Sequence, residues 1–328
     1  MAEILPFAHA ATLPQHYRIT HIAHQAEGGG VRSTARIFNT EASLEVTWLA
    51  RQPDTRLTRD TVVSPRWKRA PRANDRPIEI SRLVRLDRPE RSLNLFQTLP
   101  GGEADVVRRA AALWERLSLP FQELFNALFW DEHRFTRFCK APGSLSGHHA
   151  GEGGTLRHSV EVAETVLRLL SLHQGAHPDV ALAAALLHDA GKADEYAPRS
   201  RGWTLTDRGR LLGHRNTILE WLAVARSRMR LGLPEAHYLA LLHALTATKA
   251  PDWAGMRQPQ TPEALLLSLA DRASGDADLI NRCAAEEGGW GQGHPHLRGR
   301  PWTVPEGKPR PRLRGMEELI RSIQDPAP

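Results

Sequence analysis

The chain has 328 residues, 41% hydrophobic and 24% charged, which is ordinary for a globular protein of one or two domains. Its longest apolar run, residues 180–187, is far shorter than the roughly 20 residues of a transmembrane helix. The first residues lack a basic region followed by an apolar stretch, so we expect neither a membrane span nor a signal peptide. Two cysteines exclude a disulfide framework and a cysteine-rich zinc site, and we expect a cytoplasmic protein.

The formal net charge of +6 is concentrated in two segments. Residues 51–91 hold twelve Arg/Lys against six Asp/Glu, and residues 298–314 hold six against one. Arginine-rich segments attract the phosphates of nucleic acids, so single-stranded nucleic acid is the expected partner. A solvated arginine surface is the alternative that charge by itself leaves open.

Residues 1–100 are predicted to form a small β-barrel. Five segments alternate apolar and polar residues or are rich in β-branched residues, at 17–23, 31–38, 42–50, 61–64 and 77–86. Five short strands favour an OB-like barrel, a fold that often binds oligonucleotides, over another small antiparallel sheet. Trp67, Lys68 and Arg69 are the candidate contacts with a strand, since an indole stacks on bases and cations bind phosphates.

Residues 101–285 are predicted to be helical, which makes the fold mainly α with an N-terminal barrel. The apolar period changes to about 3.6, with helices expected at 103–117, 120–131, 155–173, 179–190, 211–229, 234–246 and 261–285. Residues 286–328 are rich in Gly, Pro and Arg and are expected to be an irregular basic tail, with a short helix near 315–323.

Histidines and aspartates recur inside these apolar helices. His188 and Asp189 are adjacent at the end of LAAALLHDAGK, and His158, His214, His243 and Asp271 lie at helix-sized intervals around them. A buried His or Asp must be hydrogen-bonded, charge-paired or bound to a metal. One such residue is usually a satisfied core residue, but six in this order indicate a divalent transition-metal site.

The order of these residues, with the sequence HDAGK at 188–192, resembles the HD-domain metal-dependent phosphohydrolases. Within that superfamily the chain is most similar to the YhaM-type 3′-to-5′ exoribonucleases, which join an OB-like barrel to a helical HD domain. The resemblance is carried by residues 148–159, 185–196, 206–214 and 261–276, and it is strongest over 135–280.

The resemblance implies a role for each matching position. His158, His188, Asp189 and Asp271 would hold one metal ion, and Asp189 would bridge to a second ion held by His214 and His243. Lys192 would face the phosphate and act with Asp189 in catalysis, while two further histidines would line the site and contact the substrate, namely His148 and His149. The segment after His243, ALTATKAPDW, lacks the further histidine pair of the family, so a single-metal site stays open.

A mixed set of imidazole and carboxylate ligands suits Mn²⁺, Fe²⁺, Co²⁺ or Zn²⁺ better than Mg²⁺ or Ca²⁺, and the resemblance favours Mn²⁺. The sequence therefore predicts a metal-dependent phosphodiesterase, a 3′-to-5′ exonuclease on single-stranded RNA or DNA. Two alternatives stay open: a phosphohydrolase of mononucleotides or cyclic nucleotides, and a non-catalytic nucleic-acid-binding module with a structural metal. A homo-oligomer is also possible, and the sequence does not choose between RNA and DNA.

Overall fold

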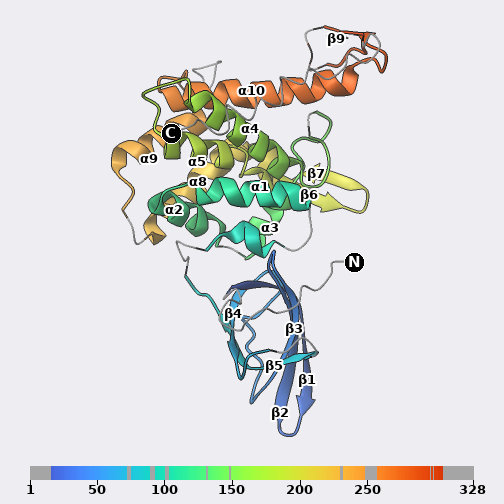
Figure 1. The fold of residues 1–328 in the computed structure, drawn as a ribbon, viewed down its shortest axis with the longest axis vertical. Helices are drawn as coiled ribbons and strands as arrows, with labels where there is room; N and C mark the ends of the chain where they lie inside the picture. Colours follow the sequence, from blue (N-terminus) through green and yellow to red (C-terminus); the bar gives the residue numbers. More distant parts are fainter. Residues whose placement is uncertain are drawn as a thin grey trace, which may run out of the picture. The chain divides into compact units, whose positions relative to one another are not determined.

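The computed structural model of the protein describes residues 16–71, 75–88, 93–99, 103–130, 132–147, 149–229, 232–247, 257–295, 297 and 299–305 (Figure 1). The chain divides into two compact units, Met1–Gly275 and Asp276–Pro328. The helices up to residue 275 and every predicted metal ligand fall in the first unit.

Five strands near the N-terminus form a closed barrel: β1 (Tyr17–Glu27), β2 (Gly30–Phe38), β3 (Ser43–Ala50), β4 (Val62–Trp67) and β5 (Ile78–Arg85). The order is β1-β2-β3-β5-β4 and β1 pairs with β4, so no strand is left as an open edge. β3 and β5 run parallel, whereas the other neighbours are antiparallel. The predicted barrel is confirmed, and its strands lie within one or two residues of the expected positions except at β1 and β4, which run further.

Alternating side chains fill the barrel. In β2, Ser33, Ala35 and Ile37 are buried, while the residues between them face outward, as the two-residue period of a strand requires. Trp48 is buried in the same core and so packs rather than stacking on a ligand. The core of the barrel is thus separate from the larger helical core.

The helical region consists of α1 (Ala104–Glu115), α2 (Leu119–Phe129), α3 (Glu132–Lys140), α4 (Gly154–Leu170), α5 (Pro178–Leu187), α6 (Lys192–Glu195), α7 (Asp207–Leu211), α8 (Gly213–Arg228), α9 (Glu235–Thr246) and α10 (Pro262–Cys283). A short 3₁₀ helix, η1 (Leu95–Thr98), precedes them. α5 is apolar on every side and is the central helix, since Val180 to Leu187 are all buried. It packs against α4 and α9, which brings the segments that carry the predicted ligands together.

Several local features differ from the sequence prediction. α5 ends at Leu187, so the His188–Asp189 pair lies in the tight turn that follows the helix. The expected helix at 211–229 is found as α8, but α7 before it was not predicted, and Gly213, with a positive φ of 72°, stands where α8 begins. A hairpin of β6 (Tyr196–Arg199) and β7 (Gly202–Leu205), together with helix α3, was not predicted.

The second unit holds the end of α10 and part of the tail. Gly289–Trp290 (β8) pairs with Trp302–Thr303 (β9), so the tail that we expected to be irregular contains a short antiparallel pair. The helix expected near 315–323 lies outside the described residues. Within the described part of the chain, no helix combines the length and the apolar character needed to cross a membrane.

Candidate metal centre

Four segments bring the predicted ligands to one place. His158 lies in the middle of α4, His188 and Asp189 follow α5, His214 begins α8 and Asp271 lies on α10. The first three of these residues are almost completely buried. Buried ionisable side chains from separate segments are costly unless they have partners, so their contacts decide what the site can do.

Three of these side chains form a group in which each offers one ligand atom, all within 4.8 Å of one another: His158, His188 and Asp271. Nε2 of His158 lies 3.0 Å from an oxygen of Asp271 and 3.7 Å from Oδ2 of Asp189. Nε2 of His188 lies 3.6 Å from the same Asp189 oxygen and 3.8 Å from Asp271. Both carboxylates therefore face both imidazoles.

His214 approaches Asp189 from the other side. Its Nε2 is 3.4 Å from Oδ1 of Asp189, whereas the imidazoles of His158 and His188 face Oδ2. Asp189 thus lies between two sets of imidazole nitrogens. This is the arrangement that a carboxylate bridging two ions would need, as the resemblance implies.

Each of the three imidazoles has its other nitrogen, Nδ1, held by an acceptor. Nδ1 of His188 donates to the carbonyl of Ala185 at 2.8 Å, and Nδ1 of His214 donates to the Glu195 carboxylate at 2.7 Å. Nδ1 of His158 lies 3.1 Å from Oγ of Ser274, whose hydroxyl donates to Glu161. Because the Ser274 proton is used, Ser274 accepts from His158.

In their neutral forms, all three imidazoles therefore carry the proton on Nδ1 and a lone pair on Nε2. The lone pairs face carboxylate oxygens, so acceptors oppose acceptors across the site, and Nε2 of His188 is buried without a hydrogen-bond partner in the described residues. A cation bound between His158, His188 and Asp271 would satisfy the lone pairs of these two imidazoles and this carboxylate. The donor set of imidazole and carboxylate fits a divalent transition metal, and the Nδ1 contacts are of the kind that orient metal-bound histidines.

The protonation equilibria of the site agree with this assignment. Burial lowers the pKa of His188, which keeps its ring neutral near pH 7. Burial by itself would raise the pKa of Asp271, but the contact with His158 and the neighbouring His188 outweigh it and lower that pKa to about 2. The site thus offers a neutral imidazole at His188 and an ionised carboxylate at Asp271, the forms that bind metals.

Lys192 lies inside this site rather than at its mouth. It is buried, its ammonium lies 2.6 Å from Oδ2 of Asp189, and it also donates to the carbonyl of Gly143. Burial would raise the pKa of Asp189, but the Lys192 ammonium and the surrounding imidazoles hold that pKa well below its usual value. The contact of Lys192 with a phosphate, which the resemblance implies, stays a prediction.

The structure does not bring His243 into the group. Its Nε2 accepts a hydrogen bond from the backbone N–H of Gln260 at 2.9 Å, and no ion pair joins it to Asp189 or Asp271 in the described part of the chain. Its neighbours Ala244 and Leu245 do line the cavity beside the site. As a ligand of a second metal, His243 stays a prediction without a supporting contact.

The loop before α4 bears the remaining predicted side chains. His149 is buried, and its Nε2 lies 3.1 Å from Glu161 and 3.4 Å from Ser274, so it supports the group that orients His158. His148 lies outside the described residues. A Cβ on Gly154 would stand 1.9 Å from the carbonyl oxygen of His149, so the loop packs on α4 at a distance that only glycine allows.

The predicted strand contacts on the barrel have acidic partners. Trp67 is half-buried and packs against the barrel core. Lys68 pairs with Glu79 at 2.5 Å, and Arg69 pairs with Asp75 at 2.9 Å. Their role in substrate binding stays a prediction, and these ion pairs reduce the positive charge that they offer to a strand.

Sequence reasoning missed the residues that orient the histidines. Ser274 lies three residues after Asp271 on α10, and Glu161 lies three residues after His158 on α4. Residues at this spacing share one face of a helix, so polar residues at i+3 from a ligand were a usable signal. Glu195 follows Lys192 at the same spacing, but its contact with His214 depends on the approach of α6 to α8.

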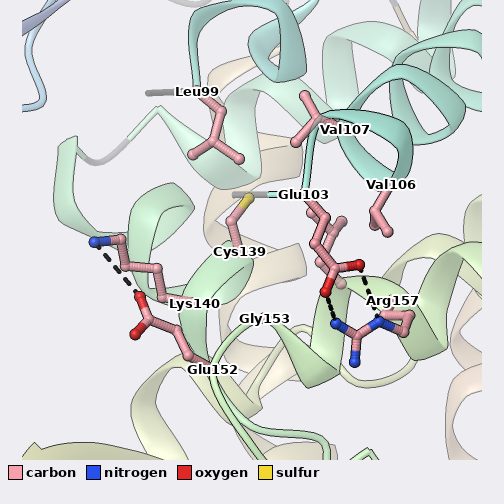
Figure 2. Close-up of a pocket in the computed structure, with 10 residues that line it drawn as sticks. Leu99, Glu103, Val106, Val107, Cys139, Lys140, Glu152, Gly153 and Arg157 are labelled. Carbon is pink, nitrogen blue, oxygen red and sulfur yellow. Dashed lines mark hydrogen bonds and ion pairs between the residues drawn. The ribbon is translucent and has the colours of Figure 1, made fainter. Parts of the chain in front are cut away.

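A second cavity, of about 310 Å³, lies between α1, α3 and α4 (Figure 2). Its rim carries two ion pairs, Glu103 with Arg157 and Lys140 with Glu152, around apolar side chains and the thiol of Cys139. None of the predicted site residues lines it. Burial raises the pKa of the Cys139 thiol, so it is protonated and unreactive near neutral pH.

Comparison with known proteins agrees with the geometry. Residues 155–276 match the family model of the HD domain. This range includes His158, His188, Asp189, His214 and Asp271, but not the loop before α4 that carries His149. The chain therefore contains an HD domain, joined to an N-terminal barrel of five strands.

Similar relatives include 3′-5′ exoribonucleases named YhaM. The one from Geobacillus sp. (strain WCH70) is 27% identical over 148 residues, which cover 44% of this chain and 44% of the relative. The one from Bacillus subtilis (strain 168) is 26% identical over 146 residues, 44% of this chain and 46% of the relative. The match thus spans less than half of either protein. No solved structure matches the chain.

Proposed function

We propose that this protein is a metal-dependent phosphodiesterase that removes nucleotides from the 3′ end of single-stranded RNA or DNA. The observation that carries the proposal is the convergence of Nε2 of His158, His188 and His214 on the carboxylates of Asp189 and Asp271. The HD-domain match supports hydrolytic chemistry, and the 3′-5′ exoribonuclease activity of the relatives supports the polarity of degradation.

A divalent metal bound here, which we expect to be Mn²⁺, would supply an activated water near pH 7 and neutralise phosphate charge. The chain's own residues do the positioning. Ser274, Ala185 and Glu195 fix the three imidazoles with their lone pairs inward, and Lys192 keeps Asp189 ionised. His158 and His188 are themselves buried, which strengthens the electrostatic interactions of their imidazoles.

The barrel offers a surface for the strand. Arg66 on β4 and Arg82 on β5 are directly opposite each other in the register, and both side chains are exposed. Neither has an acidic partner among the described residues. Like charges opposite each other on neighbouring strands destabilise a sheet, so a polyanion that binds between them would relieve the repulsion. This pair supports a polymeric substrate over a mononucleotide.

The test is a time course on 5′-labelled single-stranded RNA and DNA with Mn²⁺, compared with the same reaction in a chelator. We expect a ladder that shortens from the 3′ end with Mn²⁺ and no products in the chelator. The double variant His188→Ala, Asp189→Ala should lose hydrolysis and keep most of its strand binding. His173→Ala, which changes an exposed histidine outside the site, is the matched control and should behave as wild type.

Undiminished degradation by the double variant would overturn the assignment. Rapid turnover of mononucleotides or a cyclic nucleotide, with oligonucleotides left intact, would instead favour the phosphohydrolase alternative. Bound metal with no hydrolysis of any of these substrates would favour a binding module.

A further inference from the structure

The metal group opens onto a cavity of about 360 Å³. Its walls include His188, Asp189, His214 and Asp271, so a ligand in the cavity would contact the metal-binding atoms. This volume lies in the range of small-molecule sites, which runs from about 300 to 1,000 Å³. The cavity is therefore where the reacting end of a substrate would lie.

Three cationic side chains line this cavity: Lys192, Arg215 and Arg272. Lys192 is the least available to a ligand, because its ammonium is buried against Asp189 and the carbonyl of Gly143. To reach a phosphate it would have to leave a buried carboxylate, which is unfavourable. Among the side chains that line the cavity, the two arginines are then the cations available to a substrate phosphate, beside a bound metal.

Arg215 and Arg272 stand beside metal ligands in the chain. Arg215 follows His214 at the start of α8, and Arg272 follows Asp271 on α10, so two separate helices each place an arginine on the wall of the same cavity. Arg215 is half-buried and Arg272 is exposed. Among the described residues neither forms an ion pair or a side-chain hydrogen bond. By contrast, Arg208 on α7 and Arg226 on α8 each form an ion pair with a glutamate.

An arginine that lines a cavity and has no carboxylate partner is able to bind an anion there. The planar guanidinium presents several N–H donors in a fork that matches two oxygens of a phosphate, which a single ammonium cannot do. Two such groups from different helices, next to metal ligands, define an anion site with room for a nucleotide.

We propose that Arg215 and Arg272 bind the phosphate oxygens of a nucleotide in this cavity, the role that the family resemblance would give to Lys192. The inference rests on the proposed function in that the nucleotide is the terminal residue of the strand or its released monophosphate. The arginine proposal can be tested separately from the proposed function, because binding of a nucleoside monophosphate does not require hydrolysis.

The test measures binding of adenosine 5′-monophosphate by calorimetry, in excess Mn²⁺, to the full chain and to the variants Arg215→Gln and Arg272→Gln. Loss of a charged hydrogen-bonding partner should weaken binding by about tenfold to a hundredfold in each variant. Adenosine, which lacks the phosphate, should bind wild type and variants equally. Arg228→Gln, an exposed arginine of α8 outside the cavity, is the matched control and should bind as wild type.

Metal content is measured for each protein, because both arginines adjoin ligands. Where a glutamine variant loses metal, the lysine variants Arg215→Lys and Arg272→Lys replace it, and these should bind with intermediate affinity because they keep the charge but not the fork.

Unchanged affinity for the monophosphate in both arginine variants would overturn the proposal, as would an equal loss of affinity for adenosine. No binding by wild type would overturn it too. Failure of wild type to degrade RNA or DNA would count against the proposed function, and the arginine proposal would still be decided by the binding data.

Discussion

Ser274 links the buried His158 to the half-buried Glu161 through a single hydroxyl group. It accepts a hydrogen bond from Nδ1 of His158 at 3.1 Å and donates one to Glu161 at 2.9 Å. The carboxylate thus acts on the imidazole through the serine, which holds the lone pair of Nε2 toward the metal position. Partners of this kind affect metal binding without touching the metal.

The variant Ser274→Ala should lower metal affinity by about tenfold to a hundredfold, because His158 loses the acceptor that fixes its orientation. Competition of the metal-loaded protein with a chelator of known affinity measures this change. Ser227→Ala, whose hydroxyl donates to a helix carbonyl on α8, is the control and should bind metal as wild type. Equal affinity in Ser274→Ala and wild type would show that Ser274 does not position His158.

Lys192 and Asp189 form a buried ion pair at 2.6 Å, so removal of the lysine leaves an unpaired carboxylate in the interior. We expect Lys192→Met to lower the free energy of unfolding of the chelator-treated protein by about 3–5 kcal/mol at pH 7. Unfolding in urea measures this change in the free energy of unfolding. Lys140→Met removes a partly exposed lysine whose partner is 3.7 Å away, and it should cost far less.

The same pair predicts a pH dependence. The pKa of Asp189 is lower in the folded protein than its unfolded value of about 4. As the pH falls, the Asp189 carboxylate is therefore protonated in the unfolded chain before it is protonated in the folded protein. The stability that the ionised carboxylate contributes is complete above that value and is lost as the pH falls toward the folded pKa. The stability difference between wild type and Lys192→Met should therefore be largest near neutral pH and shrink below about pH 4. A difference that grows toward acid pH would contradict the pairing.

At the scale of the elements, the turn between α5 and α6 must pass very close to α8. A Cβ on Gly191 would stand 2.2 Å from the carbonyl oxygen of His214 and 2.8 Å from its carbonyl carbon. This close approach sets the position of His214 relative to Asp189, which lies two residues before Gly191. The glycine is required here by packing, because its φ is negative.

Gly191→Ala should therefore lower the free energy of unfolding by about 3 kcal/mol and weaken metal binding, since the backbone of α8 must move away. Thermal unfolding and metal titration measure the two effects. Gly232→Ala, where no atom lies within 4 Å of the added Cβ, is the control and should leave both unchanged. Wild-type metal binding in Gly191→Ala would mean that this contact does not set the position of His214.

At the scale of the whole molecule, the chain combines a barrel that has its own core with a helical region that bears the metal ligands. The opposed pair of Arg66 and Arg82 makes the barrel's contribution testable without deleting the barrel. Because each arginine that neutralises a phosphate releases a counterion, its loss should appear in the salt dependence of binding.

The double variant Arg66→Gln, Arg82→Gln should weaken binding of single-stranded RNA and reduce the slope of log affinity against log salt by about 1.4, roughly 0.7 for each arginine. Metal content should stay at the wild-type value. Arg108→Gln, which removes an exposed arginine paired with Asp105 on α1, is the control and should leave the slope unchanged. An unchanged slope in the barrel variant would show that the strand does not bind across β4 and β5.

Much of this organisation follows from local sequence patterns. A two-residue period predicts strands and a period of 3.6 predicts helices, and the barrel followed by a helical region was predicted in this way. His158, His188 and Asp271 stood out because polar residues in apolar helices need partners, and the structure brings these three together. The hairpin β6–β7 and the short helix α7 were missed, because a few residues with a glycine carry little periodic signal.

The amino-acid sequence by itself determined which residues have metal-binding chemistry and which segments are apolar enough to bury them. Only the tertiary structure decided how those residues meet: that Lys192 pairs with Asp189, that Gln260 holds His243, and that Arg215 and Arg272 face one cavity. The physical reason is that residue spacing defines the face of one helix, whereas contacts between helices depend on how all of their side chains pack.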